Sequence, residues 1–157
     1  MAFPCFYFPF RILFFLFVCS FSFSFSFSAH KFHDGRKWLL SFKIDITNDP
    51  HASMANWSPA VHLCNWTAVT CSRRHADRVV SLDLSGMDLS GSISPSLGNL
   101  SFLHTLNLSA NALHGHIPPQ LGRLFRLRNL WLRNNFLQGN IPTEFASLKH
   151  LQQLYLG

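Results

Sequence analysis

Leucines along residues 77–157 recur at a constant interval of 24 residues. Three phases of this repeat are occupied by Leu82, Leu106, Leu130 and Leu154, by Leu84, Leu108, Leu132 and Leu156, and by Leu89, Leu113 and Leu137. Two further phases hold Gly91, Gly115 and Gly139, and Ile93, Ile117 and Ile141. This self-similarity predicts a solenoid, because one unit cannot bury its own leucines and the stacking of neighbouring units buries them.

The spacing within one unit predicts its local structure. The segment L-x-L is a short strand with both leucines facing inward, one rung of a parallel sheet. Asn111 and Asn135 lie three residues past the second leucine of their units, where an inward amide can satisfy backbone groups as the chain leaves the strand. We therefore predict an asparagine ladder that runs from coil to coil. One rung is missing in the first unit, where Met87 takes the place of the asparagine.

Residues 1–28 follow a different pattern and contain 11 of the 17 phenylalanines. Arg11 is their only charged residue, and an unbroken apolar run of eight follows at residues 12–19. A membrane-spanning helix needs about 20 apolar residues. A positive residue, a shorter apolar core and then small residues instead indicate a secretory signal peptide. We predict cleavage after Ser28, with Ala29 as the competing position and an uncleaved anchor as the alternative.

The rest of the composition agrees with export. Two cysteines follow the leader, Cys64 and Cys71, and an oxidising compartment would join them in a disulfide. Four N-x-S/T sequons support secretion as a group. They make candidate glycosylation sites of Asn56, Asn65, Asn99 and Asn107. Charged residues are only 13% of the chain, with a net charge of +6, which excludes a disordered charged tail.

The repeat unit resembles the plant-specific extracellular leucine-rich repeat, whose hallmark L-x-G-x-I-P stands at residues 113–118 and 137–142. The segment before the repeats resembles the N-terminal cap of plant leucine-rich-repeat receptor kinases. Residues 39–43 match the cap helix, and residues 64–71 match the family's C-x-W-x-G-V-x-C signature, with Ala68 in place of the usual glycine. The resemblance implies an α/β solenoid of 24-residue plant-type repeats behind a helical, disulfide-bonded cap.

Three parts follow from these patterns. We predict a signal peptide at residues 1–28, an N-terminal cap at residues 29–76 and leucine-rich repeats at residues 77–157, three of them full and one truncated. The fourth unit ends at Gly157, so we expect either the start of a longer ectodomain or a truncated product.

No catalytic constellation accompanies the repeats. The sequence has no Gly-rich phosphate loop, no H-R-D or D-F-G motif and no nucleophile elbow, so we expect neither enzymatic activity nor a cofactor. His114 and His116 occupy variable positions of the repeat and no third ligand accompanies them, so no metal site is predicted. Four basic residues form a run, Arg123, Arg126, Arg128 and Arg133. Because we expect the chain to be exported, we interpret this run as a solvated face, or as a surface attracted to acidic cell-wall polymers, and not as a nucleic-acid site.

The middle residue of each L-x-L should point outward from the concave side of the sheet. With one flanking arginine, these positions are Asp83, Asn107, Trp131, Tyr155 and Arg133. Adjacent strands lie about 4.8 Å apart, so the rings of Trp131 and Tyr155 should touch. Exposed aromatic residues beside an arginine are typical of binding hot spots, and we predict that this concave face binds a partner. The alternative is an exposed tryptophan without a function.

The resemblance also implies a role. It predicts an extracellular recognition module, the N-terminal part of a plant receptor-like kinase ectodomain, in the apoplast or on the outer face of the plasma membrane. Its partners would be a protein or peptide ligand and a co-receptor. Contact with a membrane would come only through a downstream anchor absent from this chain, and a Ser/Thr kinase domain would lie downstream as well. Two alternatives stay open: a secreted repeat inhibitor of pathogen cell-wall-degrading enzymes, and a truncated or decoy receptor product.

Overall fold

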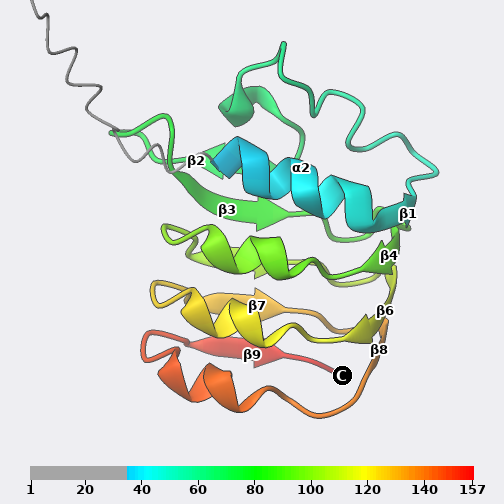
Figure 1. The fold of residues 1–157 in the computed structure, drawn as a ribbon, viewed down its shortest axis with the longest axis vertical. Helices are drawn as coiled ribbons and strands as arrows, with labels where there is room; N and C mark the ends of the chain where they lie inside the picture. The colour runs from blue at the N-terminus through cyan, green and yellow to red at the C-terminus, as the bar shows by residue number, and fades with distance from the viewer. Residues whose placement is uncertain (1–34) are drawn as a thin grey trace, which may run out of the picture. The chain divides into compact units, whose positions relative to one another are not determined.

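The computed structural model describes residues 35–157, which form a stack of similar coils with a helix across one end (Figure 1). The predicted signal peptide, residues 1–28, lies outside the described residues. Within residues 35–157, no helix is both long enough and apolar enough to cross a membrane.

Two sheets run through the stack. The five-stranded sheet has the order β2 (Val69–Cys71), β3 (Val79–Asp83), β5 (Thr105–Asn107), β7 (Asn129–Trp131) and β9 (Gln153–Tyr155). The four-stranded sheet has the order β1 (Ile46–Asn48), β4 (Ser90–Ser92), β6 (Ala112–His116) and β8 (Phe136–Gln138). Strands of successive repeats pair in parallel, with Leu82 opposite Leu106 and Leu106 opposite Leu130. The 24-residue period is thus the strand register, and the predicted solenoid is confirmed.

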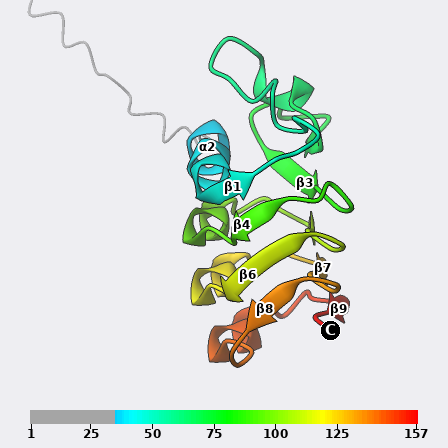
Figure 2. The same cartoon turned by 90° about the vertical axis from the view of Figure 1, so that its right-hand side faces the viewer.

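Short 3₁₀-helices close the coils on the side away from the five-stranded sheet. They are η2 (Pro95–Asn99), η3 (Pro119–Arg123) and η4 (Thr143–Ser147), and Figure 2 shows them in a column beside β4, β6 and β8. The column is tight at Gly98, where a Cβ atom would overlap the backbone carbonyl of Gln120 in the next coil. Each coil therefore rests directly on the backbone of its neighbour.

The first coil departs from the repeat at Ser94, and the structure accommodates this change. Ser94 caps η2 through its side chain, which accepts a hydrogen bond from the backbone N–H of Ser96. Pro118 and Pro142 at the same position in later coils supply no such bond. The serine replaces the rigidity of proline with a side-chain cap, so the geometry of the coil is kept.

The core is a column of leucines between the two sheets. Leu82, Leu106 and Leu130 are fully buried, whereas Leu154 at the same position is 39% exposed. Ile141 is 56% exposed, although Ile93 is buried. The difference follows from stacking, because no described coil lies beyond the last one.

The cap covers the other end of both sheets. β1 pairs antiparallel with β4, and β2 pairs antiparallel with β3, so neither first repeat strand is left as an open edge. The approach of β1 requires Gly91, where a Cβ atom would overlap the carbonyl of Asp45. The cap therefore adds one antiparallel strand to the end of each sheet.

Helix α2 (Gly35–Asp45) and a tryptophan pair form the interior of the cap. The helix buries Leu39 and Phe42. The rings of Trp57 and Trp66 stack with centroids 5.4 Å apart, next to the 3₁₀-turn η1 (Leu63–Asn65). The disulfide between Cys64 and Cys71 joins η1 to the end of β2. The predicted helical, disulfide-bonded cap is therefore present.

Candidate binding face on the five-stranded sheet

The predicted outward column is aligned along the stack. Asp83 lies opposite Asn107, Asn107 opposite Trp131, and Trp131 opposite Tyr155 in the parallel register. A second column beside it holds Ser81, Thr105, Asn129 and Gln153. Because each pair is 24 residues apart in the chain, the repeat itself brings these side chains together.

An aromatic pair with an adjacent cation occupies the last two rungs. The ring centroids of Trp131 and Tyr155 are 6.5 Å apart and their planes are inclined by 39°. The guanidinium carbon of Arg133 lies 6.0 Å from the centroid of the Tyr155 ring. Tyr155 is 50% exposed, so the cluster faces solvent and is accessible to a partner.

A hollow of about 580 Å³ opens on this face. Its lining consists of Ser85, Gly86, Asn107, Ser109, Ala110, Trp131, Arg133, Asn134, Gln153 and Tyr155. Two aromatic rings and one cation thus stand among small and amide side chains. The volume falls in the usual range for ligand sites, about 300–1,000 Å³.

Two of the predicted face residues behave differently from the others. Asn107 is only 8% exposed, and its Oδ1 accepts a hydrogen bond from the N–H of Ser109 at 3.1 Å. It therefore forms the floor of the hollow. Asp83 is exposed but does not line the hollow, and its Oδ1 accepts a hydrogen bond from the hydroxyl of Ser85 at 2.7 Å.

The lining also includes three residues from the turns after the strands, which the sequence pattern did not indicate and which share one phase of the repeat. Gly86, Ala110 and Asn134 follow the strands at intervals of 24 residues. All three have positive φ, with values of 66°, 55° and 56°. Their 24-residue spacing was visible in the sequence, but glycine, alanine and asparagine have no side-chain property in common. What they share is the left-handed turn, a backbone property that composition does not reveal.

Two buried polar atoms on this face lack partners among the described residues. They are the indole Nε1 of Trp131 and the hydroxyl of Ser109. An unpaired buried donor costs about 1–3 kcal/mol.

Asparagine side chains behind the face join each coil to the next. The amide of Asn111 donates to the carbonyl oxygens of Leu84 at 2.8 Å and Leu108 at 3.0 Å. Its Oδ1 accepts from the N–H groups of Met87 and Leu89, at 3.2 and 3.0 Å. The turn of the first coil is therefore satisfied from the second coil, although it has Met87 instead of its own asparagine.

Asn135 repeats the arrangement one coil later. It donates to Leu108 and Leu132, each at 2.9 Å, and accepts from the N–H of Leu113 at 3.1 Å. These bonds hold the strand ends that carry the candidate binding face in a fixed relation.

The candidate glycosylation sites differ in accessibility. Asn65 is exposed and Asn99 is half-buried. The Nδ2 of Asn56 donates to the carbonyl of Asn65 at 2.9 Å, and its Oδ1 accepts from the N–H of Thr67 at 3.1 Å. Asn107 is buried in the floor described above. The folded chain therefore offers Asn65 and Asn99 more freely than Asn56 and Asn107.

The other candidate sites lie apart from this face. His114 and His116 are on β6 of the four-stranded sheet, and residues 35–157 contain no group of three or more side chains suited to hold a metal ion. Arg123, Arg126 and Arg128 lie outside the hollow that Arg133 lines. The basic run of the sequence is thus divided between two surfaces.

Comparison with known families identifies both parts of the structure. Residues 34–72 match the family described as leucine rich repeat N-terminal domain. Residues 78–100, 102–124 and 126–148 match the family described as leucine rich repeat. The chain therefore belongs to the leucine-rich-repeat family and carries its N-terminal cap domain.

The relatives are plant leucine-rich-repeat receptor-like kinases. The LRR receptor-like serine/threonine-protein kinase EFR from Arabidopsis thaliana is 49% identical over 69 residues, which cover 43% of this chain and 7% of the kinase. The chain spans less than a tenth of the length of the first curated relatives that it matches.

Solved structures show the same fold. A chain of the BIR3–SERK2 complex from Arabidopsis thaliana aligns with a TM-score of 0.69 and 37% identity, over 76% of this chain and 65% of that one. The ectodomain of the plant membrane receptor kinase GASSHO1/SCHENGEN3 from Arabidopsis thaliana, in complex with Casparian Strip Integrity Factor 2, aligns with a TM-score of 0.73 and 35% identity. That alignment covers 78% of this chain and 15% of the ectodomain.

Proposed function

We propose that this chain is an extracellular recognition module, the N-terminal part of a plant leucine-rich-repeat receptor kinase ectodomain, and that its five-stranded sheet binds a peptide or protein. The observation that carries the proposal is the cluster of Trp131, Arg133 and Tyr155 in the hollow of that sheet. Tryptophan, tyrosine and arginine are the residues most often found at binding hot spots.

The chemistry of the hollow suits a peptide segment. The two rings are rigid anchors that can cover an apolar side chain, while Arg133 can pair with a carboxylate. Gln153, Ser109 and Asn134 offer polar groups around them. A main chain lying along the hollow would find hydrogen-bond partners there as well as apolar contact.

Two structural relatives support this class of partner. The BIR3–SERK2 structure is a complex of two proteins, and the GASSHO1/SCHENGEN3 ectodomain was solved with Casparian Strip Integrity Factor 2 bound. In our proposal the chain contributes recognition, and any catalytic step belongs to a kinase domain elsewhere in a longer protein. An exported chain also accounts for the disulfide of the cap.

A binding screen with matched variants tests the proposal. The full chain, secreted from plant cells, would be screened against a panel of secreted plant peptides and leucine-rich-repeat ectodomains. For a true ligand, Trp131→Ala should weaken binding by about 2 kcal/mol, roughly 30-fold. Phe136→Ala is the control, because Phe136 is an aromatic residue 68% exposed on β8 of the other sheet.

The comparison of these two variants decides between the faces. A ligand that binds the Trp131 variant normally and the Phe136 variant poorly would move recognition to the four-stranded sheet. If no peptide or ectodomain in the panel bound the chain, the proposal of a recognition module would be contradicted.

A further inference from the structure

A second surface of the molecule concentrates positive charge. It is the edge of the five-stranded sheet where the repeat strands begin, formed by residues 72–78, 101–104, 123–128 and 149–152. We call it the basic edge. It carries seven cationic side chains, those of Arg73, Arg74, Arg78, Arg123, Arg126, Arg128 and Lys149. Residues 35–157 contain 11 Lys and Arg residues in all, so this edge holds most of them.

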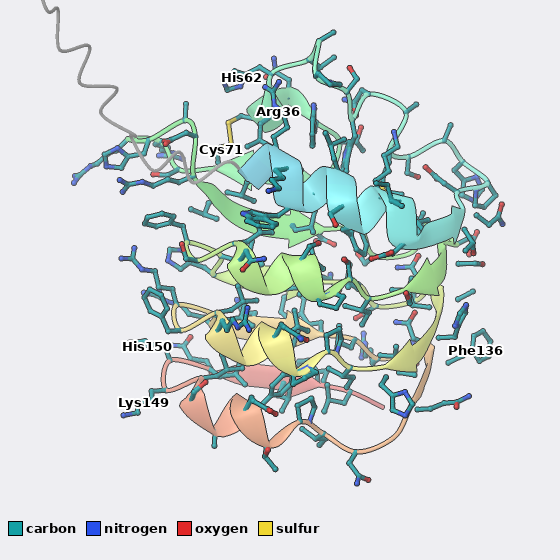
Figure 3. All side chains as sticks on the ribbon, viewed as in Figure 1. Arg36, His62, Cys71, Phe136, Lys149 and His150 are labelled. Atoms are coloured by element: carbon teal, nitrogen blue, oxygen red, sulfur yellow. A yellow bond between two sulfur atoms is a disulfide. The ribbon has the colours of Figure 1, made fainter. Side chains whose placement is uncertain are left out.

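The parallel topology explains why these segments meet. Strands β3, β5, β7 and β9 run in the same direction, so the loops that lead into them lie at the same edge. β2 is antiparallel to β3, so its C-terminal loop joins them. Figure 3 shows Lys149 and His150 at this side of the stack, with Phe136 at the opposite side.

Aromatic rings hold two of these arginines in a row along the stack. The guanidinium carbon of Arg78 lies 4.4 Å from the centroid of the Phe102 ring, and that of Arg126 lies 4.7 Å from the same centroid. Arg126 is also 5.4 Å from the centroid of Phe125. Residues 78, 102, 126 and 150 share one phase of the 24-residue repeat. The row of Arg78, Phe102, Arg126 and His150 therefore follows the axis of the solenoid, with one residue in each coil.

The basic edge has far fewer carboxylates than cations. Asp77 is the only carboxylate within its segments, and no carboxylate of residues 35–157 forms an ion pair with any of the seven cations. The positive charge of this edge also affects the pKa of His104. Burial, and then the guanidinium groups of Arg128 and Arg126, lower the pKa of His104 below its ordinary value of 6.5.

We propose that the basic edge binds an acidic polysaccharide that lies along the solenoid axis, with its carboxylates facing the cations of residues 72–78, 123–128 and 149–152. The arrangement is complementary in charge and direction, because three of the four segments along the axis, residues 72–78, 123–128 and 149–152, carry cations, and charges recur along such a polymer. Planar guanidinium groups suit carboxylates, and the ring of Phe125, 49% exposed, offers an apolar surface for a sugar face. This site is separate from the proposed peptide face, where Arg133 lies over Tyr155.

Single substitutions on the two surfaces test the proposal. The full chain would be titrated with de-esterified polygalacturonate, with the fully methyl-esterified polymer as the uncharged comparison. Arg126→Gln and Arg128→Gln should each weaken binding about fivefold, the effect of one cation at an anionic surface. Arg133→Gln removes the same charge from the other face and should leave binding unchanged. Unfolding midpoints of the three variants would verify that each one is folded.

A second measurement does not depend on substitution. Carboxylates beside Arg126 and Arg128 would offset their field, so the pKa of His104 followed by NMR should rise when polygalacturonate saturates the chain. Equal affinity of the Arg126 and Arg133 variants, or an unchanged His104 pKa at saturation, would overturn the proposal. Binding to phosphatidylserine vesicles without binding to polygalacturonate would also overturn it and would assign the edge to a membrane surface.

Discussion

The ring of Tyr155 lies against the ring of Trp131 because the two residues are register partners on β9 and β7. The two residues are 24 positions apart in the sequence. The contact exists because successive strands are one repeat apart and because both side chains leave the sheet on the same face. The accessible aromatic surface of the proposed binding face depends on this pair.

The first prediction concerns the energetic coupling of that pair. In a double-mutant cycle of Trp131→Ala and Tyr155→Ala, the free energy of unfolding should show a coupling of about 0.5–1.5 kcal/mol. Urea unfolding of the full chain measures it. The cycle of Trp131→Ala with Phe136→Ala is the control, because the two residues lie on different sheets, and its coupling should stay within about 0.5 kcal/mol. Equal coupling in the two cycles would contradict the contact.

The second prediction concerns the asparagine ladder. Asn111→Ala leaves the N–H groups of Met87 and Leu89 and the carbonyl of Leu84 without their partners, so unfolding should become easier by about 3 kcal/mol. Asn135→Ala should cost less, because Asn135 is more exposed than Asn111. Asn129→Ala is the control, since its side chain bonds only the hydroxyl of Thr105 among the described residues. A smaller loss for Asn111 than for Asn129 would rule out the ladder as a main link between coils.

The third prediction concerns Ala68, which stands where the family signature has glycine. Its φ is 67°, a left-handed conformation that disfavours a side chain. Ala68→Gly should therefore stabilise the chain by about 0.5–1 kcal/mol, the relief of strain outweighing the greater freedom of glycine in the unfolded state. Ala55→Gly, at an exposed position without positive φ, should destabilise it. Thermal unfolding of the two variants gives the sign directly.

The fourth prediction concerns pH. The pKa of His104 is lowered in the folded chain by burial and by Arg128 and Arg126, so the folded state takes up this proton less readily than the unfolded state. The contribution of neutral His104 to the free energy of unfolding is then fully present above pH 6.5. It declines as the pH falls through that value toward the folded pKa. In His104→Gln this part of the decline should vanish, whereas the exposed His75→Gln should keep it. Denaturant unfolding at pH 7 and pH 5 gives the comparison, and identical profiles for wild type and His104→Gln would refute it.

The fifth prediction concerns glycans. In material secreted from plant cells, Asn65 and Asn99 should carry glycans, while Asn107 and Asn56 should be largely unoccupied because their side chains are buried or hydrogen-bonded. Glycopeptide mapping reads all four sites. Full occupancy of Asn107 would place a glycan in the floor of the hollow, and the proposed peptide site could not then exist on this sheet.

Much of the repeat architecture was determined by the sequence alone. The 24-residue phases of Leu82 and Leu84 specify the strands, their inward leucines and the register, because a coil buries its leucines by stacking against its neighbours. The column from Asp83 to Tyr155 follows from the same period. The asparagine positions and the cysteine pair could also be predicted from the sequence. The asparagines satisfy backbone groups at the turns, and the cysteines pair in an oxidising compartment.

Tertiary structure alone decided how those columns become surfaces. Asn107 became a floor residue because it is buried between the register partners Asp83 and Trp131 of the neighbouring strands. The left-handed turns at Gly86, Ala110 and Asn134 set the rim of the hollow. The parallel topology divided the basic run, leaving Arg133 over Tyr155 and bringing Arg78 and Arg126 to one phenylalanine ring. A period states which residues are equivalent, but exposure and charge at each position depend on what the neighbouring coils and loops place beside it.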